Sequence, residues 1–169
     1  MKGEDTIDEL SQALVSELLA SNKWVSTAES CSGGWIAKSI TDIAGSSACF
    51  GYGAVSYSNA AKESMLGVSP AILEQHGAVS EQAVIAMADG CIKLSGADYA
   101  VAVSGIAGPD GGSEDKPVGT VWFGWAARSA GGISTTAQRQ EFEGDREQVR
   151  SQTVVVALQG LRVRLRADG

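Results

Sequence analysis

Short strand-like segments that alternate with helical patterns constrain the fold of this chain more than any other feature of its sequence. Three such segments are 24–28, 51–57 and 99–103. Each is apolar or rich in small and β-prone residues, and each leads into a turn with serine, asparagine or glycine, which is typical of a strand end. Apolar residues at helical spacing predict helices over 6–20, 35–43, 58–66, 70–77, 80–94 and 145–165.

The last third of the chain predicts a hairpin. Two strands, 120–127 and 133–142, are joined by a turn at Gly131-Gly132. With 169 residues the chain is long enough for one sizeable core and short for two domains. The sequence therefore predicts an α/β fold, a single domain over residues 1–169 in which a mixed β-sheet is flanked by helices.

Composition excludes several classes of function. The net charge is −7 and the pI about 4.7, which argues against a surface that binds nucleic acid or an anionic membrane. There is no apolar run of ~18 residues, as a membrane span needs, and the polar, acidic residues 1–9 are unlike a signal or transit peptide. Three scattered cysteines without a CxxC pair predict no disulfide and no metal site, and fit a reducing cytoplasm.

The segment Thr27–Gly34 is the strongest candidate for a reactive site. It places two hydroxyls and one thiol, those of Ser30, Ser32 and Cys31, on a turn between a strand and a helix. The N–H groups at the start of such a helix can stabilise an oxyanion beside a nucleophile. The structural alternative is an N-cap serine with glycines that only let the chain turn.

A serine nucleophile here needs a base other than histidine. The only histidine, His76, precedes a helix-ending glycine and is expected at a helix C-terminus. A lysine in a desolvated pocket can serve instead, because burial lowers its pKa. Lys62 is the best candidate, since the carboxyl ends of parallel strands would bring it close to Ser30. Taken alone, Lys62 also fits an ordinary surface lysine on a helix.

The glycine-rich loop at 105–112 is a candidate anion site. Its density of glycine lets backbone N–H groups approach a phosphate or carboxylate, although the loop matches neither a dinucleotide fingerprint nor a Walker A motif. A flexible surface loop is the alternative. Asp110, Glu114 and Asp115 match no known metal-binding pattern, so no metal and no cofactor is expected.

Five ordered segments jointly resemble the CinA C-terminal domain family. They are TAESCSGG (27–34), YSNAAK (57–62), GAVS (77–80), SGIAGPDGG (104–112) and KPVGTV (116–121). The similarity extends from about Leu10 to Leu161 and implies a three-layer sandwich. It also implies hydrolysis of the carboxamide of nicotinamide mononucleotide (NMN) to nicotinic acid mononucleotide and ammonia. Longer members of the family carry an N-terminal pyrophosphatase-like domain, and its activity is not expected here.

The resemblance also implies roles for individual residues. Ser30 would be the nucleophile, Lys62 its general base and Tyr57 a proton relay or orienting hydroxyl. We expect the substrate to be bound by two further groups of residues. They are the turn Cys31, Ser32, Gly33 and Gly34, and the more distant Asn59, Gly105, Ile106, Ala107, Gly108 and Arg146. Ser32 stands where threonine is common in the family, which keeps a small hydroxyl.

Backbone N–H groups at Ser32–Gly34 are expected to hold the oxyanion, and those at Gly105–Gly108 the substrate phosphate. Arg146 is a further candidate for binding the phosphate, although it also fits an ordinary first-turn residue balanced by Asp145.

Other interpretations remain open. Cys31 could be the nucleophile, because a helix N-terminus stabilises a thiolate. The chain could hydrolyse another amide or ester, or be a ligand-binding module associated with competence, as the family name suggests. A homo-oligomer is also possible, because at least one of Trp122, Phe123 and Trp125 is expected to point outward from its strand.

Overall fold

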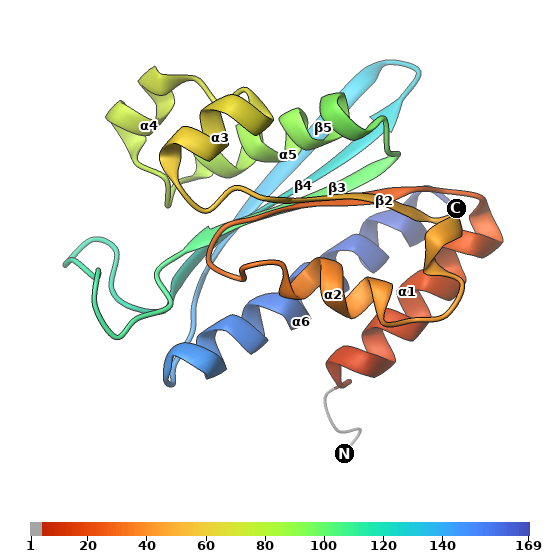
Figure 1. The fold of residues 1–169 in the computed structure, drawn as a ribbon, viewed down its shortest axis with the longest axis horizontal. Helices are drawn as coiled ribbons and strands as arrows, with labels where there is room; N and C mark the ends of the chain where they lie inside the picture. Colours follow the sequence, from red (N-terminus) through yellow and green to blue (C-terminus); the bar gives the residue numbers. More distant parts are fainter. Residues whose placement is uncertain (1–4) are drawn as a thin grey trace.

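The computed structural model describes residues 5–169, which form one five-stranded sheet with helices on both faces (Figure 1). The first elements are helix α1 (Ile7–Ser21), strand β1 (Val25–Glu29), helix α2 (Trp35–Thr41), the 3-10 turn η1 (Ser46–Ala48) and strand β2 (Phe50–Val55). Next come helices α3 (Asn59–Leu66), α4 (Pro70–His76) and α5 (Glu81–Ser95), then strand β3 (Tyr99–Gly105). The last are strands β4 (Thr120–Ser129) and β5 (Gly132–Glu141) and helix α6 (Arg146–Ala167).

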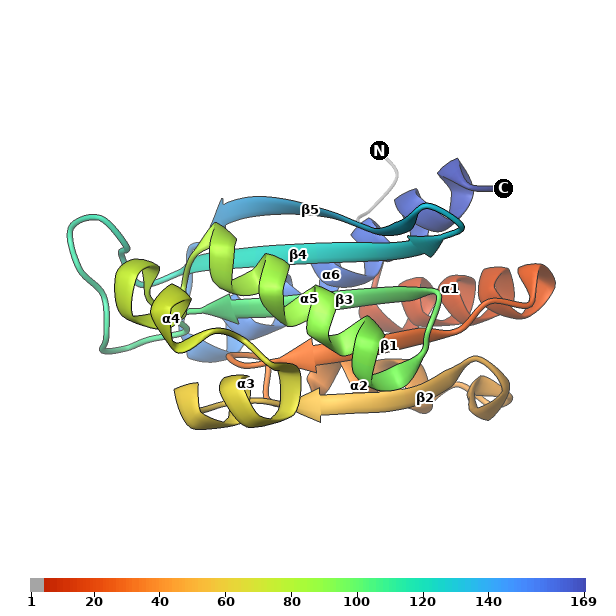
Figure 2. The same cartoon turned by 90° about the horizontal axis from the view of Figure 1, so that it is seen from above.

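The sheet is mixed, as predicted. Its strand order is β2-β1-β3-β4-β5. Strands β2, β1 and β3 are parallel, whereas β4 runs antiparallel to β3 and pairs with β5 as a hairpin. The carboxyl ends of the three parallel strands therefore lie at the same edge, beside α3 and the loop that follows β3 (Figure 2).

The size of the side chains on β3 separates the two helical layers. Val101 and Val103 pack into a core with α1, α2 and α6 on one face of the sheet. Ala100 and Ala102 face the other side, where α3, α4 and α5 form a second core. The alternation of large and small residues along a strand buried on both faces thus produces the three-layer sandwich (Figure 1).

Element boundaries differ from the prediction where tertiary pairing decides them. Gly105, expected in the glycine loop, belongs to β3 because it pairs with Val121 of β4. Strand β2 ends two residues early, although Ser56 still donates its N–H to the carbonyl oxygen of Glu29 at 2.9 Å. The hairpin strand β4 and helix α6 each extend two residues further than predicted.

The expectation of an outward-facing aromatic on β4 is wrong. Phe123 and Trp125 are fully buried and stack with their ring centroids 5.4 Å apart. Trp122, on the opposite face, is half-buried against the core formed by α3, α4 and α5. None of the three is exposed, since helices cover both faces of the sheet.

Among residues 5–169, no helix combines the length and the apolar character that crossing a bilayer requires. Residues 1–4, part of the segment that is unlike a signal peptide, lie outside the described residues. The three cysteines are buried and unpaired.

Candidate active site

Ser30 is the first residue after β1, at the edge where the parallel strands end (Figure 2). Its backbone N–H donates to the carbonyl oxygen of Val103 at 3.1 Å, and its own carbonyl accepts from the N–H of Gly33 at 3.1 Å. Gly33 and Gly34 adopt positive φ values of 61° and 98°, which lets the chain turn back directly into α2. These contacts fix the hydroxyl of Ser30, a residue that is 8% exposed.

Lys62 reaches the same point from α3. The residue is 1% exposed, and its Nζ lies 2.9 Å from Ser30 Oγ. The same Nζ donates to the carbonyl oxygens of Ser56 at 2.8 Å and Tyr57 at 3.1 Å. Burial lowers the pKa of Lys62 below its usual value of 10.5, because desolvation disfavours the ammonium form. A buried lysine amine thus lies in hydrogen-bond contact with a serine hydroxyl.

Helix α3 is placed by local sequence. Its N-cap is Ser58, whose Oγ accepts from the N–H of Ala61 at 3.0 Å. The helix ends at Gly67, which adopts the left-handed conformation with φ 67°. Lys62 and Leu66 are the buried residues of this short helix, so the lysine lies on the inward face, one turn from the core residue.

Glu29, a residue to which sequence reasoning gave no role, holds the turn that carries Ser30. Its side chain is fully buried, and Oε1 accepts from Ser32 Oγ at 2.7 Å and from the N–H of Ile36 at 2.8 Å. Oε2 accepts from the N–H of Ala37 at 3.0 Å. The carboxylate therefore occupies the N-terminus of α2 that we expected to be available to a reactive group.

Three backbone donors remain on the turn. The N–H of Gly33 is used by Ser30, and that of Trp35 donates to the carbonyl oxygen of Ser32 at 3.1 Å. The N–H groups of Cys31, Ser32 and Gly34 have no hydrogen-bond acceptor among residues 5–169. The N–H groups without an acceptor are thus in the turn itself, whereas those of Ile36 and Ala37 in α2 donate to Glu29.

Cys31 is poorly suited to be the nucleophile. Burial, together with the nearby carboxylate of Glu29, raises the pKa of its thiol to about 12. The thiolate form is therefore scarce at neutral pH.

Arg150, on α6, is a second residue without a signal in the sequence. Its Nε donates to the carbonyl oxygen of Cys31 at 3.1 Å, and its Nη2 donates to that of Ser32 at 3.2 Å. Its guanidinium lies 5.8 Å from the ring centroid of Trp35. Arg150 and Trp35 line a shallow hollow of about 520 Å³ together with Gly33 and Gly34 of the turn that carries Ser30.

Tyr57 contacts the serine and lysine through its backbone. Its carbonyl oxygen accepts from Lys62 and lies 3.4 Å from Ser30 Oγ. The side chain is 60% exposed, and its hydroxyl accepts from Arg146 Nη2 at 3.3 Å. Arg146 Nη1 donates to the carbonyl oxygen of Gly108 at 2.6 Å. Arg146 therefore joins the phenol of Tyr57 to the glycine loop.

The glycine loop offers fewer donors than expected. The N–H of Ile106 donates to the carbonyl oxygen of Thr120 at 2.9 Å, so it is not available to a ligand. Within the described chain, the N–H groups of Ala107 and Gly108 have no acceptor. Asn59 lies exposed at the start of α3, close in sequence to the lysine.

The acidic residues of the loop form no metal centre. Across residues 5–169, no group of three or more histidine, cysteine, aspartate or glutamate side chains is arranged to hold a metal ion.

Comparison with known proteins identifies close relatives. Residues 7–165 match the family described as the CinA C-terminal domain. The nicotinamide-nucleotide amidohydrolase PncC of Enterobacter agglomerans is 60% identical over 156 residues, which cover 92% of this chain and 93% of that protein. The protein of the same name from Escherichia coli (strain K12) is 57% identical, covering 90% of this chain and 91% of that one.

A solved structure has the same fold. The competence/damage inducible protein CihA from Agrobacterium tumefaciens superposes with a TM-score of 0.90 at 42% sequence identity. The match covers 98% of this chain and 99% of that chain.

Proposed function

This chain belongs to the CinA C-terminal domain family, and from that membership we propose that it is an amidohydrolase that hydrolyses the carboxamide of NMN. The products would be nicotinic acid mononucleotide and ammonia. Two relatives named for hydrolysis of a nicotinamide nucleotide, aligned over about nine-tenths of each chain, support the substrate. The observation that carries the mechanism is the 2.9 Å contact between Lys62 Nζ and Ser30 Oγ, made by a lysine that is buried.

In the acylation step, neutral Lys62 removes the proton of Ser30 as Oγ attacks the amide carbon. The ammonium that forms is stabilised by the carbonyl oxygens of Ser56 and Tyr57, which already accept from Nζ. Lys62 then gives this proton to the amide nitrogen, the carbon–nitrogen bond breaks, and ammonia leaves. The direct contact between Lys62 and Ser30 favours this route over a relay through the phenol of Tyr57, which is hydrogen-bonded to Arg146.

The tetrahedral oxyanion needs donors close to Ser30. We assign this role to the N–H groups of Ser32 and Gly34, two of the three on this turn that have no acceptor within the described residues. Glu29 accepts from the hydroxyl of Ser32 and Arg150 donates to its carbonyl oxygen, so these donors are fixed before the substrate arrives.

Deacylation uses the same groups. Water loses a proton to Lys62 while its oxygen attacks the ester carbonyl, and the proton returns to Ser30 Oγ as the carboxylic acid leaves. Over the two steps, one amide and one water give one acid and one ammonia.

The phosphate of NMN would lie between the glycine loop and α6. Ala107 and Gly108 supply free N–H groups there, and Arg146 supplies a guanidinium already hydrogen-bonded to the loop. Cys31, Gly33 and Asn59 would line the approach to the reacting carbonyl. The buried, unpaired cysteines fit work in a reducing cytoplasm, and the negative net charge fits a small-molecule substrate better than nucleic acid.

The test is ammonia release from NMN without added metal, by the wild type and by folded Ser30→Ala and Lys62→Met variants. Each variant should lose at least about 10²–10⁴-fold in kcat, the contribution of positioned acid–base groups. Lys93→Met, at an exposed position of α5, is the matched control and should retain full activity.

Other outcomes redirect the proposal. Activity that survives Ser30→Ala would move the nucleophile elsewhere. Wild-type turnover of other amides or esters, but not NMN, would assign a different hydrolase. A lack of turnover on every substrate would favour a binding module.

A further inference from the structure

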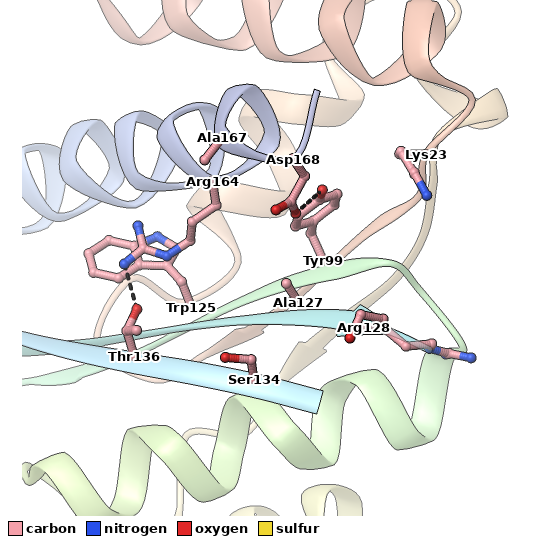
Figure 3. A pocket seen from close by; sticks show the side chains of 11 residues that line it. Lys23, Tyr99, Trp125, Ala127, Arg128, Ser134, Thr136, Arg164, Ala167 and Asp168 are labelled. Atoms are coloured by element: carbon pink, nitrogen blue, oxygen red, sulfur yellow. Dashed lines mark hydrogen bonds between the residues drawn. The ribbon is translucent and has the colours of Figure 1, made fainter. Parts of the chain in front are cut away.

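A second cavity lies at the opposite end of the sheet from Ser30. It has a volume of about 490 Å³ and lies between the last turns of α6 and the ends of β3, β4 and β5 (Figure 3). Its lining includes Tyr99 at the first residue of β3, whereas Ser30 follows the carboxyl end of the neighbouring parallel strand β1. A volume of this size accommodates a small organic ligand.

Arg164 is the central cation of this cavity. Its guanidinium lies 4.2 Å from the ring centroid of Trp125 (Figure 3). Its Nη1 donates to the carbonyl oxygen of Gly160 at 2.9 Å, and its Nη2 donates to Thr136 Oγ1 at 2.6 Å. Both acceptors are neutral, and no carboxylate among residues 5–169 forms an ion pair with Arg164.

Arg164 is half-buried, and no acidic side chain compensates its desolvation. Burial therefore lowers its pKa. By contrast, Arg162 and Arg166 on the same helix both pair with Glu17 at 2.8 Å. The guanidinium of Arg164 is held in place over an indole without a carboxylate partner, so it can bind an anion.

The other charges around the cavity leave Arg164 as its central cation. Lys23 lies at the rim, 3.7 Å from Asp98. The side chain of Arg128 points away from the cavity (Figure 3) and lies near Gly96, at the end of α5. The one acidic side chain in the lining is Asp168, and it accepts from the hydroxyl of Tyr99 at 2.5 Å (Figure 3).

We propose that this cavity is a second binding site, separate from the hydrolase centre, for a small organic anion whose phosphate or carboxylate group is bound by Arg164. The hydroxyls of Ser134 and Thr136 also line the cavity and add donors for the same oxyanion. Helix α6 carries Arg146 in its first turn and Arg164 in its last, so one element reaches both sites.

The test uses ¹⁹F NMR of protein labelled with 5-fluorotryptophan. The chain has four tryptophans. Trp125 reports on this cavity, and Trp35, beside Arg150, reports on the catalytic turn. The probes are AMP, adenosine and succinate.

AMP or succinate should shift the Trp125 signal, whereas adenosine should not. A response to AMP alone identifies phosphate as the recognised group, and a response to succinate identifies carboxylate. Arg164→Gln should weaken binding about 10- to 100-fold, as expected for loss of hydrogen bonds to a charged group. Arg146→Gln, the matched change at the other end of α6, should leave the Trp125 response unaltered.

Two further measurements do not depend on Arg164→Gln folding well. Lys23→Gln, which removes the cation at the rim of the cavity, should weaken binding about two- to five-fold. Wild-type affinity should also fall as salt is raised from about 0.05 to 0.5 M, since the attraction is electrostatic. The proposal is overturned if adenosine acts like AMP, if only Trp35 responds, or if neither anion shifts Trp125 at about 10 mM.

Discussion

Replacing Glu29 by glutamine tests whether its buried carboxylate holds the turn that carries Ser30, the proposed nucleophile. The change preserves the shape of the side chain and removes its charge. Oxygen Oε1 can still accept from Ser32 and Ile36, but only as a neutral acceptor. The amide nitrogen replaces Oε2 and faces the N–H of Ala37, so that two donors meet where one hydrogen bond existed.

The expected loss in the free energy of unfolding follows from these three contacts. A hydrogen bond to a charged group contributes about 1.5–3 kcal/mol, and a buried N–H without an acceptor costs about 1–3 kcal/mol. One contact is lost, two are weakened, and the desolvation cost of a buried charge is relieved, so we expect a net loss of about 2–4 kcal/mol in the free energy of unfolding. Displacement of the turn should also lower kcat by about 10²-fold with KM little changed, because the affected groups position the reaction.

The measurements are urea unfolding and steady-state ammonia release from NMN, with Glu63→Gln as the control. Glu63 is exposed on α3, next to Lys62, so the same chemical change there should alter neither quantity. A Glu29→Gln variant whose free energy of unfolding stays within about 0.5 kcal/mol of the wild type, the usual range for surface changes, would refute this reasoning. A loss of stability with kcat unchanged would limit Glu29 to a role in folding.

Other variants test the remaining features of the site and the core. Because burial lowers the pKa of Lys62, kcat/KM should rise with pH and level off below pH 10.5. Stability to urea should also rise between that lowered pKa and 10.5, since there the unfolded chain keeps a proton that native Lys62 has released. Cys31→Ala should retain most of the ammonia release, since its thiol stays protonated at neutral pH. Arg146→Gln should raise KM for NMN about 10-fold or more, with a smaller effect on an analogue without phosphate. Gly160→Ala should lower the melting temperature, because its Cβ would lie 2.2 Å from Trp125.

The sequence predicted the fold because local pattern and tertiary packing agree along most of this chain. Thr6 and Glu9 form the capping box expected at the start of α1, and Ser80 caps α5 as predicted. The errors fall where pairing with a distant segment decides the end of an element. Gly105 is a strand residue only because β4 lies beside it, a partner that propensity alone does not reveal.

The site was predictable where it depends on topology and not where it depends on side-chain direction. The convergence of parallel strand ends predicted that Ser30 and Lys62 lie close together, and Lys62 Nζ is in hydrogen-bond contact with Ser30 Oγ. The contribution of Tyr57 through its carbonyl oxygen has no sequence signal, because any residue has that group. Arg150 contacts the turn from a position more than a hundred residues later, so its role depends on how α6 packs against the sheet.

In the proposed mechanism, the environment of Lys62 balances two opposing requirements of a general base. Burial favours the neutral amine, which is the form that can take the proton of Ser30. The carbonyl oxygens of Ser56 and Tyr57 favour the ammonium, which is the form that must exist during the reaction. Burial alone would give a lysine too weakly basic to hold the proton, and a carboxylate partner would keep it permanently charged. Neutral acceptors at 2.8 and 3.1 Å lie between these extremes, which is the environment that the proposed activation of Ser30 by Lys62 requires.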